Sequence, residues 1–408
     1  MTFYAAGLNY TGLASNTHVV NPEPNTHFRL FDPRFVDAFP TCKLWRVTIS
    51  LNRALKASQG MGLDETYMGY IEDTLDGLHS RGAQAILDAH DFLRTPKMVE
   101  EIKGWTVGRD RNDTAHYGKM YRLSDGMILD PEDYRNMELS KYGSTYKKSP
   151  NRKYSVHVHH VDQCLRLSEW HLMGQSGNPK LYNDDGIVHT WLAILNRLMK
   201  HPAIWGYEIM NEPYTGIELD PKTGQSFDVN AYWNKLAPRL ATEVMNRDQN
   251  RYVIVDGNFY ASASNWAKYS DSLKNIADPR GQILYAAHYY VDANGGEWAN
   301  QQKQVTADAG TTPCSNFFNW LKTNKKRGIM TEFGHPAGNE SAHLADKNLV
   351  ETANSKNICM IQWAAGPGWD KSNSTAVNYE DATGVHVKDN IRAIQPALEK
   401  RLQSYDPV

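Results

Sequence analysis

The chain has 408 residues, of which 41% are hydrophobic and 22% are charged, as in an ordinary globular protein with a large core. Its 44 lysines and arginines almost balance its 46 aspartates and glutamates. This balance argues against nucleic acid or an anionic membrane surface as the partner, because both select strongly basic proteins. No run approaches the roughly 20 apolar residues that a membrane-spanning helix requires.

Apolar runs and helical periodicity alternate along most of the chain. The runs that read as strands lie at residues 3–10, 43–49, 84–90, 204–212, 251–256, 282–290, 327–332 and 358–363. Helical patterns lie between or after them at residues 64–78, 184–198, 229–246, 265–276, 317–325, 344–355 and 387–402. Alternation with connections of this length predicts a parallel sheet. Eight units predict an α/β fold, a (β/α)8 TIM barrel that forms a single domain over residues 1–408.

The alternation breaks between residues 92 and 182, where the chain is polar and has no sustained periodicity. So long a structureless loop is unusual inside a compact domain, so we interpret this stretch as a large insertion after the third strand. We expect some helix of its own at residues 154–173. Because loops at the carboxyl end of a barrel build its binding site, we also expect the insertion to form one wall of a cleft.

Familiar metal-binding patterns are absent from the sequence. The cysteines lack a Cys-x-x-Cys pair, which argues against a zinc-ribbon site and leaves one or two disulfides open. His157, His159 and His160 suggest either a metal site or one polar face of an element. We favour the polar face, because no acid or histidine at a familiar ligand spacing accompanies them. We therefore predict no metal and no cofactor.

Two glutamates end strand-like runs. Glu212 follows the apolar stretch that begins at residue 204, and Glu332 closes the run at residues 327–332. At the carboxyl ends of two strands of one barrel, they would face each other across its mouth, roughly 5 Å apart. Glycoside hydrolysis needs such a pair, one carboxyl to protonate the leaving oxygen and one to attack the anomeric carbon. Glu208 shares the strand of Glu212 but lies too early to reach the mouth, so we leave it out.

The motif Asn211-Glu212-Pro213, together with Glu332 on the seventh strand, resembles glycoside hydrolase family 5, the cellulase family. The other signature positions of that family occur in the same strand order, at Arg46, His90, His288, Tyr290 and Trp363. The segments at residues 256–266, 288–292 and 363–369 are similar to fungal-type endoglucanases within it. The resemblance implies a retaining, endo-acting hydrolase of β-1,4-glucan with Glu332 as nucleophile and Glu212 as acid/base.

The supporting residues have expected roles in that reaction. We expect Arg46 and Tyr290 to hold the Glu332 carboxylate, and Asn211 to bind the sugar 2-hydroxyl. Trp363 would form an apolar floor under the sugar. The two remaining signature residues, His90 and His288, would fix sugar hydroxyls or the acid.

Three alternatives stay open. One is another β-glycanase of the same mechanism, such as a β-mannanase or xyloglucanase, because residues 92–182 depart from the endoglucanase pattern and leave the substrate open. The second is an inactive carbohydrate-binding barrel, against which both glutamates argue. The third is a metal-dependent hydrolase that uses the histidines at positions 157–160. We expect a secreted monomer that binds polysaccharide or oligosaccharide, although the given chain starts without a signal segment.

Overall fold

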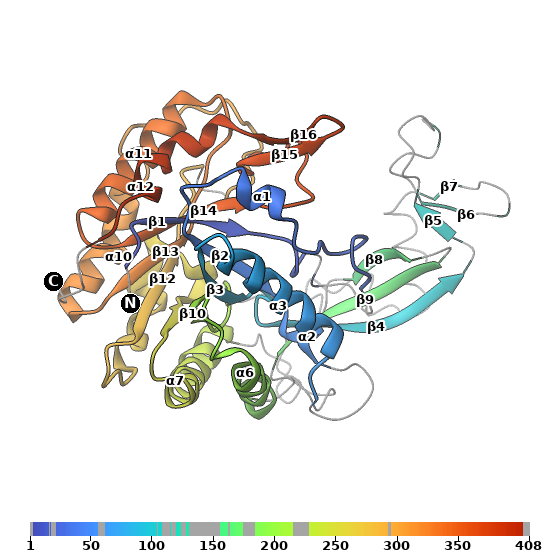
Figure 1. Ribbon diagram of the computed structural model, residues 1–408, viewed down its shortest axis with the longest axis horizontal. Coiled ribbons are helices and arrows are strands. Elements are labelled where there is room, and N and C mark those ends of the chain that lie inside the picture. Colours follow the sequence, from blue (N-terminus) through green and yellow to red (C-terminus); the bar gives the residue numbers. More distant parts are fainter. Residues whose placement is uncertain are drawn as a thin grey trace.

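Eight parallel strands close into a barrel in the computed structural model (Figure 1). The model describes residues 3–15, 17, 22–55, 62–103, 105–107, 115, 120–122, 124, 128–129, 156–161, 164–173, 184–214, 228–292 and 295–402. In chain order the barrel strands are β1 (Ala6–Tyr10), β2 (Leu44–Ile49), β3 (Gln84–Ala89), β10 (Ile204–Glu208), β11 (Tyr252–Asp256), β12 (Ile283–His288), β13 (Gly328–Glu332) and β14 (Cys359–Ala365). Each strand pairs with the next, and β14 pairs with β1, so the predicted barrel is confirmed.

Helices cover the outside of the barrel (Figure 1). The long ones are α3 (Glu65–His79), α6 (Asp184–Leu198), α7 (Val229–Arg247), α10 (Thr311–Asn324) and α11 (Glu340–Asn354). Short elements complete the loops: α1 (Pro33–Asp37), α2 (Leu51–Ala54), α8 (Asn258–Ala261), η1 (Ala263–Asn265), α9 (Trp266–Tyr269) and η2 (Asp271–Asn275). The start of α3 is set by a helix cap: the Asp64 side chain accepts a hydrogen bond from the backbone N–H of Tyr67.

The barrel interior has an apolar floor and a polar upper layer. Leu44, Ile86, Ile254 and Ile329 are fully buried in one cluster inside the barrel. Because side chains alternate between the two faces of a strand, the residues two positions later point the same way. Those residues are Arg46, Asp88, Asp256 and Thr331, each fully or almost fully buried. The alternation that builds the core therefore also gathers polar groups at the carboxyl end of the barrel.

Two predicted helices are wrong. Residues 154–173 form the antiparallel strands β8 (Val156–Val161) and β9 (Cys164–Leu172), in keeping with the period-two alternation of valine and histidine at the start of this segment. Residues 387–402 contain the end of the hairpin β15 (Asn378–Asp381) and β16 (Gly384–Val387), then η3 (Asp389–Ala393) and α12 (Gln395–Leu398). Pro396 lacks the N–H that a continuous helix would need there.

The segment after β3 contributes two small antiparallel sheets. β4 (Arg94–Lys103), β9 and β8 form one, and β5 (Trp105–Val107), β6 (Met120–Arg122) and β7 (Ile128–Leu129) form the other. β4 and β9 extend to one side of the barrel (Figure 1). Most of the rest of residues 92–182 lies outside the described residues, as do the rings of the three histidines at positions 157, 159 and 160. The single domain and the role of this segment as a cleft wall therefore stay predictions.

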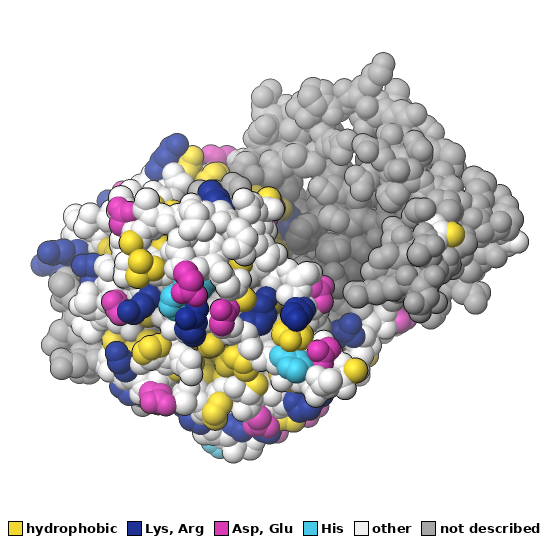
Figure 2. Space-filling model, turned by 90° about the horizontal axis from the view of Figure 1, so that it is seen from above, with side chains coloured by type: hydrophobic (Ala, Val, Ile, Leu, Met, Phe, Trp, Pro, Cys, Tyr) yellow, Lys and Arg dark blue, Asp and Glu magenta, His cyan; other side chains and the backbone are white. Residues whose placement is uncertain are grey.

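The visible surface of the barrel carries no single sign of charge. In Figure 2, lysine and arginine side chains alternate with aspartate and glutamate over the coloured face. Within the described ranges, no helix is both long and apolar enough to cross a bilayer.

A matched pair of leucines tests this packing. Leu195 on α6 is fully buried against the barrel, whereas Leu344 on α11 is 45% exposed. We expect Leu195→Ala to lower the free energy of unfolding by about 2–5 kcal/mol through lost burial and a cavity. The same truncation at Leu344 should change it by less than about 0.5 kcal/mol. Urea unfolding followed by tryptophan fluorescence measures both, and equal losses would contradict the assigned helix orientations.

Candidate active site

Arg46 is the centre of the polar layer. Its guanidinium is fully buried and donates from Nε and Nη2 to the two oxygens of Glu208, at 2.6 and 2.9 Å. Nη1 donates to Glu332 Oε1 at 2.9 Å, and Nη2 to Asn211 Oδ1 at 2.6 Å. Asp88 Oδ2 lies 3.2 Å from Nη2. One cation therefore ties together side chains from β2, β3, β10, β13 and the loop after β10.

Glu332, the last residue of β13, is held at both carboxylate oxygens. Oε1 accepts the bond from Arg46, and Oε2 accepts the phenol O–H of Tyr290 at 2.9 Å. Burial and the neighbouring Glu332 raise the pKa of Tyr290 well above its ordinary value, so the phenol stays a donor. Charge-assisted bonds of this kind orient a carboxylate and stabilise its negative charge. The contacts predicted between Glu332 and its two holders, Arg46 and Tyr290, are therefore present.

Glu212, unlike Glu332, does not lie on a strand, so the predicted strand over residues 204–212 is wrong at its end. β10 ends at Glu208, and Glu212 lies in the following loop with a left-handed φ of 44°. Its backbone N–H donates to Asp256 Oδ2 at 2.8 Å, which anchors this uncommon conformation. Its Oε1 lies 2.7 Å from His288 Nδ1. Burial, reinforced by the nearby Asp88 and Glu208 carboxyls, raises the pKa of Glu212 to about 7.

The two glutamates are close but chemically unlike. A carboxylate oxygen of Glu212, a carboxylate oxygen of Glu332 and a ring nitrogen of His288 all lie within 4.8 Å of one another. Glu332 contacts a guanidinium, whereas Glu212 contacts a neutral imidazole, since burial lowers the pKa of His288 to about 4. The site therefore places a stabilised carboxylate beside a carboxyl that holds its proton near neutral pH. That combination suits nucleophilic attack and proton donation on one substrate.

The other predicted residues line the same site. His90 stacks on Trp363, with ring centroids 5.2 Å apart and planes 13° apart, and Trp363 stays partly exposed as an apolar surface. His90 Nδ1 lies 2.7 Å from Asp88 Oδ2, and burial lowers the pKa of His90 to about 4. Asn211 Nδ2 is buried without a hydrogen-bond partner, so it is an available donor at the site. All eight predicted site residues thus gather around one end of the barrel.

Three buried acids were missed or set aside. Glu208 was left out because it lies below the mouth, yet it forms the two-bond contact with Arg46. Although burial opposes its charge, Arg46 lowers the pKa of Glu208. Burial raises the pKa values of Asp88 and Asp256 well above the ordinary range, and Glu208 adds to both. A charged residue inside an apolar strand needs a partner, and this was the available signal.

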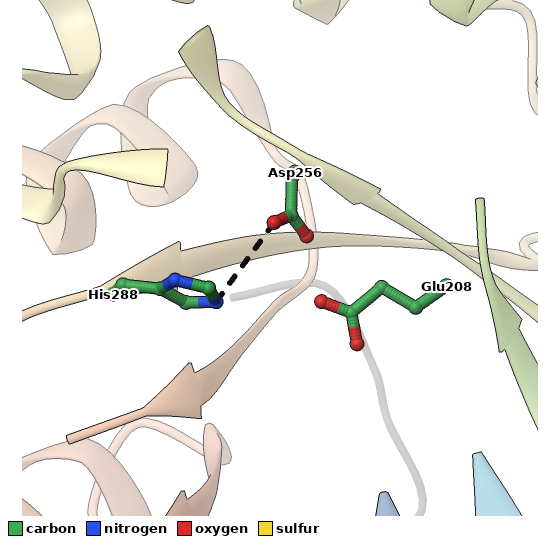
Figure 3. Close-up of side chains that lie close together, drawn as sticks. All are labelled: Glu208, Asp256 and His288. Atoms are coloured by element: carbon green, nitrogen blue, oxygen red, sulfur yellow. Dashed lines mark ion pairs between the residues drawn. The ribbon is translucent and has the colours of Figure 1, made fainter. Parts of the chain in front are cut away.

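Figure 3 shows Glu208, Asp256 and His288 converging from three strands. Among the described residues, this triplet and the triplet of Glu212, His288 and Glu332 have the spacing of potential metal ligands. Hydrogen bonds already use these atoms. Both ring nitrogens of His288 are engaged, by Glu212 at 2.7 Å and by the Thr331 hydroxyl at 2.9 Å. Arg46 donates to Glu208 and to Glu332. The donor set fits a hydrogen-bonded network better than a metal centre.

Two acid-to-amide substitutions test these charge states. Asp256 is neutral in this scheme, so Asp256→Asn keeps an oxygen for the Glu212 N–H and should change the free energy of unfolding by less than about 1 kcal/mol. Glu208→Gln removes the anion from a buried ion pair and should cost about 3–5 kcal/mol. Because the pKa of Glu208 is lowered in the folded protein, this stabilisation is present at pH 7 and fades as the pH falls. Urea midpoints at pH 7 in the reverse order would overturn the assignment.

Comparisons with known proteins agree with this geometry. The family model described as Cellulase (glycosyl hydrolase family 5) matches residues 130–368. Endo-beta-1,4-glucanase B of Emericella nidulans is 32% identical over 124 residues, which are 30% of this chain and 37% of that protein. Endo-beta-1,4-glucanase A of the same organism is 27% identical over 150 residues, 36% of this chain and 44% of that protein. The aligned part is thus less than half of each relative.

Solved structures show the fold. Pseudomonas stutzeri endoglucanase Cel5A in complex with cellobiose superposes with a TM-score of 0.70 at 18% identity, covering 100% of this chain and 98% of that one. Cel5A (EG2) of Hypocrea jecorina gives 0.59 at 15% identity, covering 96% and 98%. Together with the family model, which spans more than half of the residues, these findings identify the chain as a member of glycoside hydrolase family 5, the cellulase family.

Proposed function

We propose that this protein is a retaining endo-β-1,4-glucanase with Glu332 as nucleophile and Glu212 as acid/base. The observation that carries the proposal is the pair of carboxyls within 4.8 Å of each other in opposite electrostatic environments. Retaining glycosidases place their carboxyls about 5–5.5 Å apart, whereas inverting enzymes need roughly 6.5–9.5 Å to admit a water molecule. This spacing favours double displacement.

The proposed reaction has two steps. Glu332 attacks the anomeric carbon while Glu212 gives its proton to the leaving oxygen, which forms a covalent glycosyl-enzyme. Glu212, now a carboxylate, then removes a proton from water, which attacks the same carbon and frees Glu332. The free amide N–H of Asn211 is available to the sugar 2-hydroxyl, a bond that strengthens in the transition state. Trp363 offers an apolar surface under the sugar.

β-1,4-Glucan as the substrate is supported by the aligned fungal endo-β-1,4-glucanases and by the structural relative that binds cellobiose. A β-mannanase remains the alternative, because the residues that contact the sugar 2-hydroxyl do not by themselves exclude the epimer. A polysaccharide of this kind is too large to enter a cell, so we also propose that the protein acts outside the cell.

An exposed aromatic surface beside Glu212 supports binding of a polymer. Phe259 and Tyr260, 39% and 42% exposed, both have left-handed backbone angles, which are rare for bulky residues. Tyr260 stacks on Tyr214, with centroids 4.4 Å apart, and Phe259 stacks on Tyr269 at 4.8 Å. The Tyr260 N–H donates to the carbonyl of Pro213, the neighbour of Glu212. Since Glu212 protonates the leaving group, this surface lies where the departing part of the chain would rest.

Product stereochemistry tests the mechanism. Proton NMR of early cellopentaose digestion should show the β-anomer first, because two inversions restore the configuration. Glu332→Ala should abolish turnover, and azide should then give an inverted glycosyl azide. Glu399→Ala removes an exposed glutamate just after α12, which is not part of the site, so this matched control should behave like the unchanged protein. An initial α-anomer would exclude double displacement.

Truncation of the aromatic surface tests where the leaving group binds. Phe259→Ala and Tyr260→Ala should each lower kcat/KM for cellopentaose roughly 3- to 10-fold, as expected for one aromatic stacking contact. β-Cellobiosyl fluoride, whose leaving group is a single atom, should be cleaved at an unchanged rate. Leu344→Ala, which removes a comparably exposed apolar side chain elsewhere, is the control. Equal losses on both substrates would show that the surface does not bind the leaving group.

A further inference from the structure

A line of buried hydrogen bonds connects the anion beside Arg46 to Glu212. The Thr331 hydroxyl donates to Glu208 Oε1 at 3.1 Å. The same hydroxyl lies 2.9 Å from His288 Nε2, and His288 Nδ1 lies 2.7 Å from Glu212 Oε1. Thr331 and His288 are 0% and 3% exposed, so water does not substitute for these contacts.

The line has only one consistent direction. Glu208, held ionised by Arg46, is an acceptor only, so the single hydroxyl proton of Thr331 must go to it. Thr331 oxygen must then accept from His288, which places the imidazole proton on Nε2. In a neutral imidazole the other nitrogen carries a lone pair. His288 Nδ1 therefore accepts a hydrogen bond, and the donor that faces it is the protonated Glu212 carboxyl.

We propose that Thr331 is a positioning residue that fixes His288 as the Nε2–H tautomer and thereby keeps the proton on Glu212 in the resting protein. The proposal rests on the acid/base role proposed for Glu212 and adds a residue that touches neither the substrate nor Glu212. It assigns a chemical purpose to the hydroxyl next to Glu332 in sequence, where an aliphatic side chain would fill the same space.

The other charged groups around Glu212 do not impose this proton position. The titratable groups around the carboxyl come from the neighbouring strands and the loops that follow them: Arg46, Asp88, His90, Glu208, Asp256, His288, Tyr290 and Glu332. Burial favours protonated Glu212, His90 and Arg46 favour the ionised form, and Asp88 and Glu208 oppose it. The direct side-chain partner is His288, so its tautomer decides whether Glu212 meets a lone pair or an N–H. An Nδ1–H imidazole would instead stabilise the carboxylate.

Loss of the Thr331 hydroxyl should therefore favour the Nδ1–H tautomer of His288. In Thr331→Val, the Nε2–H group has no hydroxyl acceptor, so the proton should move to Nδ1 and donate to ionised Glu212. The proton-donating form of Glu212 would then be lost at lower pH. Asp256 Oδ2 lies 3.8 Å from Nε2, beyond hydrogen-bond distance, and already accepts the Glu212 N–H, so it does not replace the missing acceptor.

The kinetic test compares Thr331→Val, Thr331→Ser and a buried control, Thr74→Val, whose lost hydroxyl donates to a helix carbonyl. With cellopentaose, the alkaline limb of kcat/KM should lie near pH 7 in the unchanged protein and in Thr74→Val. In Thr331→Val it should move down by about one pH unit, which is about a tenfold loss at pH 8. Thr331→Ser should restore the limb. With 2,4-dinitrophenyl β-cellobioside, which needs no proton on its leaving group, all four proteins should have similar rates.

A second readout follows the tautomer directly. Nitrogen-15 NMR of histidine-labelled protein, with His288 assigned by His288→Gln, should show Nε2–H in the unchanged protein and Nδ1–H in Thr331→Val. An unmoved pH limb with an unchanged tautomer in Thr331→Val would overturn the proposal. So would equal losses on both substrates, or a serine variant that behaves like valine. If the unchanged protein cleaves no glycoside, the proposed function fails, while the tautomer measurement still decides this inference.

Discussion

The buried guanidinium of Arg46 is the interaction on which the active site depends. It is the cation among Glu208, Glu332 and Asp88, and it lies within the closed barrel, away from water. Removing a guanidinium from water is expensive, and the cost is offset only when its N–H groups meet well-placed acceptors. Here four side-chain carboxyl and amide groups from separate strands or loops supply them, together with Asn9 Oδ1 at 2.8 Å. The barrel closure that brings these strands together is thus a condition for the site.

The difference between the two glutamates follows from this arrangement. Glu332 contacts Arg46 directly and also receives the Tyr290 hydroxyl. Glu212 lies one step farther away, in a left-handed turn after the strand, and its side chain meets His288 instead. Several buried acids surround the single guanidinium of Arg46, and their mutual repulsion prevents all of them from being ionised together. Burial raises the pKa values of Asp88 and Asp256, which opposes their ionisation, so the negative charge is favoured on Glu208 and Glu332, the two glutamates that donate no proton and accept from Arg46.

Much of this was predictable from the sequence. Apolar runs located the eight barrel strands, and the polar residues at their ends located the catalytic pair proposed here. A partner for Glu208 could be expected from its place in an apolar strand, but the identity of that partner could not, because spacing along one strand does not tell which side chains meet across a barrel. Asp88 lies beside Thr48 of β2 and Glu208 of β10 only because β3 pairs with both strands in one particular register. The left-handed turn at Phe259 and Tyr260 was also invisible, since neither residue favours that conformation. β8 and β9 were predicted as a helix although the start of β8 alternates valine with histidine, because the alternation is too short to set the period of the whole segment.

The central claim is that the contact with Arg46 makes Glu332 the carboxylate that attacks the sugar. Its most direct test is covalent trapping with 2-deoxy-2-fluoro-β-cellobiosyl fluoride, which slows release of the glycosyl-enzyme, followed by peptide mass spectrometry. We expect one added fluorocellobiosyl group per molecule, attached at Glu332. A label on Glu212 or Glu208, or steady turnover of this reagent without any covalent adduct, would contradict it.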